Sequence, residues 1–199
     1  HKEAAALIWR QANFDLLTNL PNRRQFQTQL KNAIDECRQK ESGCVVLMLL
    51  DLDNFKIIND VHGHQHGDSL LKEASQRLKA CVGDNGIAAR LGGDEFTVVL
   101  KNITLKNEIA DVAKSILAEF SKPFVVNLET FHISASIGIT CYPSDAKDID
   151  ELIMNADQAM YHSKESGRNC YSYFSYGMRI AAQQRMRSIN ELYGAFQKG

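Results

Sequence analysis

The most constraining feature of the sequence is an apolar run that ends in acidic residues. Residues 44–50 are all apolar and do not alternate with polar residues, which is typical of a central strand covered on both faces. The run continues directly into Asp51, Leu52 and Asp53, so two carboxylates lie where the strand ends. A strand of this kind needs helices on both faces of its sheet, and we therefore expect an α/β layered fold.

The rest of the chain supplies those helices and further strands. Apolar residues spaced three and four apart predict helices over 1–12, 21–40, 68–82, 107–120, 148–167 and 177–198, with a short helical stretch from Asn54 and a turn at 62–67. Short apolar or alternating runs predict strands over 87–91, 96–100, 123–126, 131–139 and 171–174. The pair 87–91 and 96–100 surrounds Gly92-Gly93 and predicts a β-hairpin.

Composition excludes several classes of protein. The chain has 199 residues, with 23 Lys and Arg against 24 Asp and Glu, and this balance gives no basic footprint for nucleic acid. No apolar run approaches the roughly 18 residues of a membrane span, so we expect no membrane contact by this domain. The five cysteines form no C-x-x-C pair and are interpreted as small buried hydrophobes in a reducing cytoplasm, even if the full-length protein is membrane-anchored. The first residue is His1 rather than Met, so we expect a longer parent chain.

Two acidic pairs lie at predicted strand ends. If the strands are neighbours, Asp51 and Asp53 converge with Asp94 and Glu95, and such close carboxylates need a cation such as Mg²⁺ between them. Paired Mg²⁺ ions held by carboxylates are the arrangement used in phosphoryl transfer. Either pair taken alone is also compatible with solvated turn residues.

Other residues near these ends could complete a phosphate site. Gly92 and Gly93 lack a Cβ and allow a bulky ligand to approach the hairpin. Lys56 closely follows the acidic strand end, and Lys164 and Arg168 lie four apart at a predicted helix end, so their side chains could point the same way. Each cation could instead be an ordinary surface charge. The sequence contains neither a P-loop nor a dinucleotide-binding glycine motif.

Residues 90–96 (RLGGDEF) resemble the signature of the GGDEF family, the diguanylate cyclases. Further segments that resemble the family follow in order, at 15–23, 51–60, 63–68, 136–139 and 156–169. The resemblance extends from about residue 15 to 174. It implies a nucleotide-cyclase or polymerase-palm-like central sheet flanked by helices, with the GGDEF hairpin at the active site.

The resemblance also implies an activity. Two GTP are condensed into cyclic di-GMP and two pyrophosphates, with two domains facing each other as a transient homodimer. It implies Mg²⁺ or Mn²⁺, two per GTP, on Asp51, the Leu52 carbonyl, Asp94 and Glu95. The other implied roles are Asp94 as the base for the 3′-hydroxyl, Lys56 as transition-state stabiliser, Lys164 and Arg168 as phosphate contacts, Gly92 and Gly93 beside the substrate, and Asn59, Asp68 and nearby His64 at the guanine.

Guanine chemistry agrees with the implied role of Asp68. Guanine offers N1–H and N2–H₂ as adjacent donors that one carboxylate accepts together, whereas adenine has no such pair. We therefore expect GTP to be preferred over ATP, and replacement of Asp68 to weaken GTP binding.

The sequence departs from the family pattern before the signature. Many family members carry an inhibitory R-x-x-D product site there, but residues 83–86 are Gly-Asp-Asn-Gly, so we expect no product inhibition through that site.

By analogy, residues 1–14 resemble a helix from an upstream sensor domain, 15–174 the GGDEF domain, and 175–199 a linker helix towards an EAL phosphodiesterase domain. An alternative function is therefore a non-catalytic GTP-binding module that controls such a neighbour.

Overall fold

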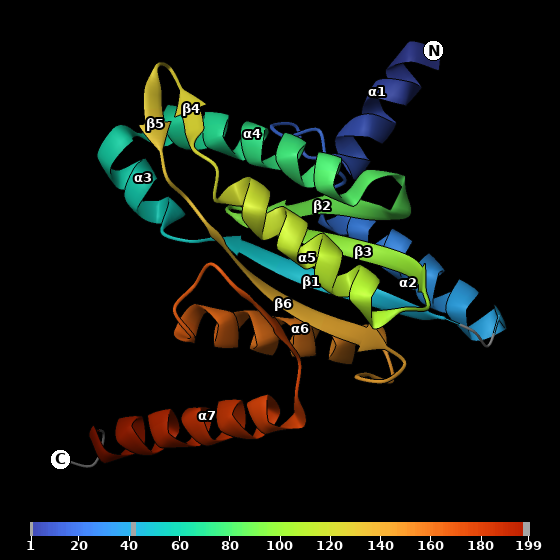
Figure 1. Ribbon diagram of the computed structural model, residues 1–199, viewed down its shortest axis with the longest axis vertical. Coiled ribbons are helices and arrows are strands. Elements are labelled where there is room, and N and C mark those ends of the chain that lie inside the picture. The colour runs from blue at the N-terminus through green and yellow to red at the C-terminus, as the bar shows by residue number, and fades with distance from the viewer. Residues whose placement is uncertain (1, 41–42, 197–199) are drawn as a thin grey trace.

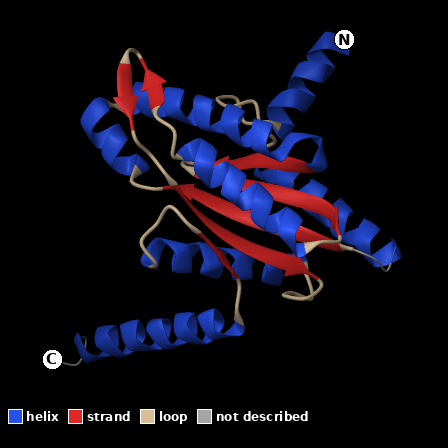
Figure 2. Ribbon diagram, in the orientation of Figure 1, coloured by secondary structure: helices blue, strands red, loops and turns tan. Residues whose placement is uncertain are grey.

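Strand β1 (Cys44–Leu52) forms the middle of a five-stranded sheet in the computed structural model, which describes residues 2–40 and 43–196 (Figures 1 and 2). The strand order is β2-β3-β1-β6-β7, with β2 (Gly86–Gly92), β3 (Glu95–Ile103), β6 (Ala135–Tyr142) and β7 (Tyr171–Tyr173). Neighbouring strands are antiparallel except β6 and β7, which are parallel. Strands β4 (Phe124–Val126) and β5 (Glu129–Phe131) form a separate small sheet.

Helices cover both faces of the sheet because both faces of β1 are apolar. Val46, Met48 and Leu50 pack in one buried cluster with residues of α4 (His64–Val82) and α5 (Lys106–Phe120). Val45 and the other odd-numbered apolar residues of β1 pack in a second cluster with α2 (Arg23–Lys40) and α6 (Ile149–Glu165). Each buried aliphatic side chain contributes roughly 1.5–3 kcal/mol. The prediction of an α/β fold with a doubly covered central strand is confirmed.

Helix α6 lies unusually close to the sheet at Gly138. A Cβ at this position would come within 2.1 Å of the Ala156 carbonyl oxygen and of the Met160 backbone nitrogen. Asp148 caps the helix by accepting a hydrogen bond from the Glu151 backbone N–H at 2.8 Å, as one of the two capping residues that the sequence offers. The close contact fixes α6, whose last turn carries Lys164, against the middle of β6.

The remaining helices are α1 (Lys2–Asn13), α3 (Phe55–His62) and α7 (Tyr176–Phe196). Helix α7 lies beside α6, and the Arg179 guanidinium joins them by donating to Glu151 and Asn155 at 2.7 and 2.9 Å. The apolar residues spaced three and four apart that predict this helix, among them Met178, Met186, Leu192 and Phe196, are therefore partly packed on the domain, although Met186 remains exposed. Leu192 and Phe196 lie outside the side chains that the structure describes.

Three predicted boundaries are wrong. The single strand 131–139 is two strands, because residues 132–134 pass from the small sheet to the main one. The predicted turn at 62–67 is confined to Gly63, and α4 begins at His64 rather than Asp68. Helix α6 ends at Glu165 instead of Gly167, because positive φ angles from Gly167 to Asn169 stop the helix.

Two sequence expectations concern the environment of the chain. No helix within residues 2–40 and 43–196 is long and apolar enough to cross a membrane. All five cysteines are free thiols, but only Cys37 is buried and the other four are half-buried, so the description of those four as buried hydrophobes is too strong.

Candidate active site

The acidic residues converge at one end of the sheet. Asp51 on β1 is the register partner of Glu95 on β3 and of Ser136 on β6. The Leu52 backbone N–H donates to the Asp94 carbonyl at 3.3 Å, which joins the end of β1 to the hairpin turn. The expectation that the two acidic segments lie on neighbouring strands is therefore correct.

Asp51 is partly shielded from water and paired with a lysine. Its side chain is 14% exposed, and its Oδ1 lies 2.9 Å from the Lys164 Nζ. Burial raises the pKa of the Asp51 carboxyl, the Lys164 ammonium opposes this, and the nearby charges of Asp94 and Glu95 raise the pKa further. Negative charge at this strand end is therefore under-compensated, and a cation would stabilise it.

The donors at this end suit a hard divalent cation. Asp51, Asp94, Glu95 and the Leu52 carbonyl offer only oxygen, which Mg²⁺ and Mn²⁺ prefer. Within the described part of the chain, no three His, Cys, Asp or Glu side chains form a group that could hold a metal ion by themselves. Mg²⁺ in nucleotide enzymes is commonly bound by one or two carboxylates, water and substrate phosphates, so these residues fit a metal that arrives with a nucleotide.

Asp53 has a different environment from Asp51. It is 4% exposed, and its carboxylate accepts hydrogen bonds from the hydroxyls of Ser134 and Ser136 at 2.6 and 2.7 Å and from the Asn169 backbone N–H at 3.1 Å. Asp53 therefore joins β1, β6 and the turn after α6. The sequence pattern had grouped it with Asp51 as an acid that a ligand can reach, and the burial of Asp53 shows that this grouping is wrong.

The hairpin turn is open on its outer side and fixed from behind. Gly93 has a φ of +54°, and nothing lies within 4 Å of a Cβ built on Gly92 or Gly93. The Arg90 guanidinium donates to the Gly93 carbonyl at 2.8 and 3.1 Å and to Asp15 at 2.9 Å. Sequence reasoning gave Arg90 and Asp15 no role, although both lie in the segments that resemble the GGDEF family.

Asp15 is itself held by several hydrogen bonds. Burial would raise its pKa, but hydrogen bonds from the Thr18 side chain and backbone and from Arg90 outweigh this and lower the pKa of the Asp15 carboxyl. The segment before α2 is thus fixed to the hairpin by an ionised pair.

Four predicted site residues, the catalytic Lys56 and three at the base, lie on α3 and α4, which form a helical hairpin beside the strand end. Lys56 is in the first turn of α3, His64 begins α4, Asp68 follows in the next turn, and all three are exposed. Asn59 packs under Gly67, where a Cβ would come within 1.9 Å of its Oδ1. Among the described residues, this buried Oδ1 has no hydrogen-bond partner.

The two predicted phosphate contacts after α6 are arranged differently from the expectation. Lys164 is in the last turn of α6, but Arg168 follows the helix end with a φ of +63°. The helical spacing argument for their common direction is therefore wrong. Arg168 nevertheless precedes Asn169, whose backbone is bonded to Asp53, so it remains near the end of β1.

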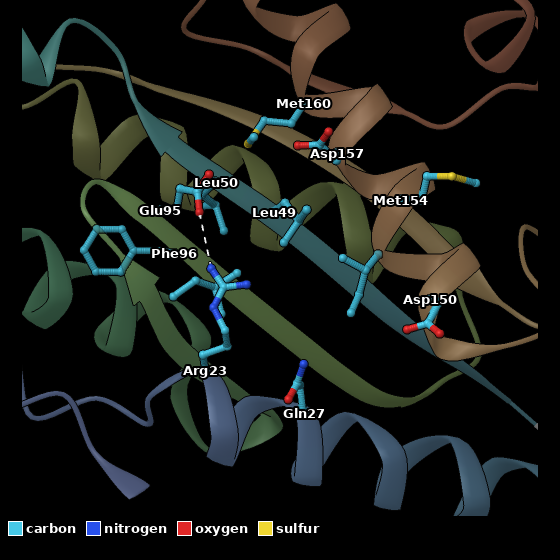
Figure 3. Close-up of a pocket in the computed structure, with 12 residues that line it drawn as sticks. Arg23, Gln27, Leu49, Leu50, Glu95, Phe96, Asp150, Met154, Asp157 and Met160 are labelled. Atoms are coloured by element: carbon cyan, nitrogen blue, oxygen red, sulfur yellow. Dashed lines mark ion pairs between the residues drawn. The ribbon is translucent and has the colours of Figure 1, made fainter. Parts of the chain in front are cut away.

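A pocket of about 570 Å³ opens beside Glu95, between α2 and α6 (Figure 3). Arg23 from α2 reaches towards Glu95, with Nη2 3.9 Å from Oε2, while Met154, Asp157 and other side chains of α6 form the opposite wall. The Arg23–Glu95 pair is half exposed and contributes little energy. Of the predicted site residues, only Glu95 lines this pocket.

Comparison with known proteins identifies the family. The model described as "Diguanylate cyclase, GGDEF domain" matches residues 12–170. The chain is 40% identical to the bifunctional diguanylate cyclase/cyclic di-GMP phosphodiesterase MucR of Pseudomonas aeruginosa over 92% of its own length and 27% of that protein. It is 36% identical to the cyclic di-GMP phosphodiesterase NbdA of the same organism, over 95% of the chain and 24% of NbdA. The chain thus spans about a quarter of these relatives.

Solved structures agree with the sequence comparison. The GGDEF domain of TpbB (YfiN) from Pseudomonas aeruginosa superimposes with a TM-score of 0.82 and 32% identity, over 85% of this chain and 99% of that one. The expected central sheet flanked by helices is the architecture shared with these neighbours. The chain belongs to the GGDEF domain family.

Proposed function

We propose that this chain is a diguanylate cyclase, which condenses two GTP into cyclic di-GMP and two pyrophosphates. The observation that carries the proposal is the register pairing of Asp51 with Glu95 at one strand end, with the Asp94 backbone bonded to Leu52. Acidic groups that meet on adjacent strands beside an open glycine turn suit a metal-bound nucleotide triphosphate.

The reaction needs two equivalent displacements. In each, a ribose 3′-oxygen attacks the α-phosphorus of the facing GTP, the bond from that phosphorus to the bridging oxygen breaks, and pyrophosphate leaves. Asp94 accepts the proton of the 3′-hydroxyl. Mg²⁺ or Mn²⁺, two per GTP, would be held by Asp51, the Leu52 carbonyl, Asp94 and Glu95 and would neutralise phosphate charge.

Cationic side chains around the strand end would bind the phosphates. Lys56 extends from the first turn of α3 and stabilises the charge that develops at the α-phosphate. Lys164 and Arg168 bind the other phosphate oxygens from the end of α6 and the turn that follows. Lys56 and Arg168 are both exposed, and neither forms an ion pair within residues 2–40 and 43–196. Both positive charges are therefore available to phosphate, which supports this role.

The helical hairpin of α3 and α4 would bind the base. Asp68 accepts from guanine N1–H and N2–H₂, with Asn59 and His64 beside it.

Each domain would hold one GTP, so turnover requires a second copy as a transient dimer. The relative MucR is named as both a cyclase and a phosphodiesterase and is more than three times as long as this chain. We propose that the whole protein carries a sensor domain before residues 1–14 and an EAL domain after residues 175–199, and that it works in the cytoplasm.

Product analysis over a range of protein concentrations tests the proposal. The chain is incubated with GTP and Mg²⁺, and the variant Asp94→Ala/Glu95→Ala is the control. We expect cyclic di-GMP to form more steeply than linearly with protein and to be absent with the variant. If wild-type protein forms no product at any concentration, the cyclase proposal is wrong.

The second candidate is a GTP-binding module that regulates a neighbouring phosphodiesterase. It is favoured by NbdA, which is named as a cyclic di-GMP phosphodiesterase and contains a segment 36% identical to this chain. Binding of GTP without any product would support this alternative.

A further inference from the structure

The Lys164–Asp51 pair lies where a divalent cation would bind in the proposed function. Lys164 Nζ is 2.9 Å from Asp51 Oδ1, and the two side chains are 32% and 14% exposed. The backbone that carries Lys164 is fixed, because the preceding Ser163 hydroxyl donates to the Ile137 carbonyl on β6 at 2.8 Å. The lysine stem therefore starts from a rigid position while its ammonium is accessible to solvent.

The three acids at this end are unequally compensated. Asp51 lies 2.9 Å from Lys164, whereas the contact of Glu95 with the half-exposed Arg23 is longer, at 3.9 Å. Within the described residues, 2–40 and 43–196, Asp94 forms no ion pair. Asp51, which is better shielded from water than Glu95, is thus the acid that already has a close cation.

We propose that Lys164 is a displaceable counter-ion, which holds Asp51 until metal-bound nucleotide arrives and then moves its ammonium to the phosphates. This inference rests on the proposed function and adds coupling between the two ligands. When free metal displaces the Lys164 ammonium from Asp51, the ammonium has no new anionic partner. Metal that arrives with a triphosphate supplies that partner, so metal and nucleotide bind cooperatively.

The chemistry of lysine suits this exchange. An ammonium and a divalent cation repel each other at the same carboxylate oxygen, so one must leave. Lysine has a flexible four-carbon stem and three rotatable donors, and it can exchange a carboxylate for a phosphate oxygen without backbone movement. A partly exposed ion pair is also weak enough to be broken by a competing ligand.

Binding of Mn²⁺ without nucleotide provides the test, since the electron paramagnetic resonance signal of free Mn²⁺ reports binding without any turnover. We expect Lys164→Met to bind Mn²⁺ about three- to tenfold more tightly than wild type, because the competing ammonium is gone. GTP should tighten Mn²⁺ binding strongly in wild type and much less in Lys164→Met.

Arg168→Met is the matched control, because it removes one positive charge nearby without touching Asp51. It should leave nucleotide-free Mn²⁺ affinity within about twofold of wild type while weakening GTP binding. Lys164→Arg keeps the charge and should also stay near wild type. Equal tightening in Lys164→Met and Arg168→Met, no tightening in Lys164→Met, or tightening in Lys164→Arg would each overturn the inference.

Asp51→Asn separates this inference from the proposed function. Loss of Mn²⁺ binding in the presence of GTP would support the proposed metal site, whatever Lys164→Met does. If Asp51→Asn binds Mn²⁺ as wild type does with GTP present, the metal assignment and the lysine exchange are both wrong.

Discussion

Asp51 and Asp53 lie two residues apart on one strand but face different groups. Asp51 is at the accessible strand end beside Glu95, and its pKa is raised, first by burial and then by the neighbouring acids against the opposing effect of Lys164. Asp53 is enclosed by three hydrogen-bond donors from within the protein. The free energy of unfolding should therefore depend strongly on the Asp53 carboxylate and only weakly on that of Asp51.

We expect Asp53→Ala to lower the free energy of unfolding by about 2–4 kcal/mol, because buried donors lose their acceptor. Asp51→Asn should change it by less than about 1 kcal/mol and abolish activity. Since the pKa of Asp51 is raised, its stabilising contribution is present at low pH and is lost as pH rises through the folded pKa. Any increase in the free energy of unfolding caused by Asp51→Asn should thus be largest at neutral pH. Urea unfolding measures both variants, and equal destabilisation by the two would contradict the distinction.

Base selectivity depends on another single carboxylate. Asp68→Ala should weaken GTP binding at least about tenfold and leave the weak ATP binding nearly unchanged, because only guanine offers two adjacent donors. Calorimetric titration with both nucleotides measures this. Asp84→Ala removes another exposed carboxylate, just after the C-terminal end of α4 and thus beyond the opposite end of that helix from Asp68, and should behave as wild type. An unchanged GTP affinity in Asp68→Ala would exclude Asp68 from the base site.

At the residue scale, the sequence predicted which acids lie at strand ends but not what surrounds them. Both Asp51 and Asp53 follow the apolar run, so local pattern treats them alike. Their difference depends on Ser134, Ser136 and Asn169, which are 81 to 116 residues from Asp53 along the chain. Only the tertiary structure brings these donors to one carboxylate and leaves the other open.

At the scale of elements, the hairpin of β2 and β3 is held by the Arg90–Asp15 pair. The pKa of Asp15 is lowered, because Thr18 and Arg90 outweigh the effect of burial, so its contribution is present above the ordinary value of 3.8 and lost as pH falls through the folded pKa. We expect Asp15→Asn to destabilise the protein clearly at pH 7 and hardly at all near about pH 2–3. Urea unfolding at several pH values measures this dependence. A penalty independent of pH would show that packing, and not the charge, links these elements.

The start of β2 leaves no room for the aspartate of an R-x-x-D product site. A Cβ at Gly86 would lie 2.7 Å from the Val99 carbonyl oxygen and 2.6 Å from Leu100 Cδ2, so the aspartate of that motif cannot be accommodated without movement of β3. We expect cyclic di-GMP not to inhibit the chain through this site. Gly83→Arg/Gly86→Asp should lose about 1–3 kcal/mol more stability than Gly83→Arg alone, without gaining product inhibition. Calorimetry that detects tight cyclic di-GMP binding to the unmodified chain would contradict the first expectation.

Elements were predictable where one pattern dominated a long segment. The doubly covered β1 and the glycine hairpin were predicted correctly, because apolar runs and glycine turns are local signals. The strand predicted over 131–139 was wrong because its alternation continues through residues 132–134, where the chain leaves one sheet for another. Arg168 was misplaced for a related reason, since spacing does not reveal a left-handed turn.

At the scale of the whole molecule, the sequence could state only that the acidic segments converge if their strands are neighbours. The order β3-β1-β6 meets that condition and also brings the end of α6 to the same edge, which no local pattern contained. The candidate site therefore combines segments from residue 51 to residue 168. A pair of such domains, each holding one GTP, should make the two new phosphodiester bonds in two different half-sites.

Mixing wild-type protein with the Asp94→Ala variant tests whether each half-site forms one of the two bonds. A mixed pair has one competent half-site and can form one bond, so we expect linear dinucleotide to accumulate and cyclic di-GMP per wild-type molecule to fall as the variant is added. Chromatography of the products measures both species, and GTP binding to Asp94→Ala confirms that the variant still delivers substrate. Asp84→Ala, mixed in the same ratios, should not reduce cyclic product. A cyclic yield that is indifferent to added Asp94→Ala would mean that one domain completes both bonds, and the facing arrangement would be wrong.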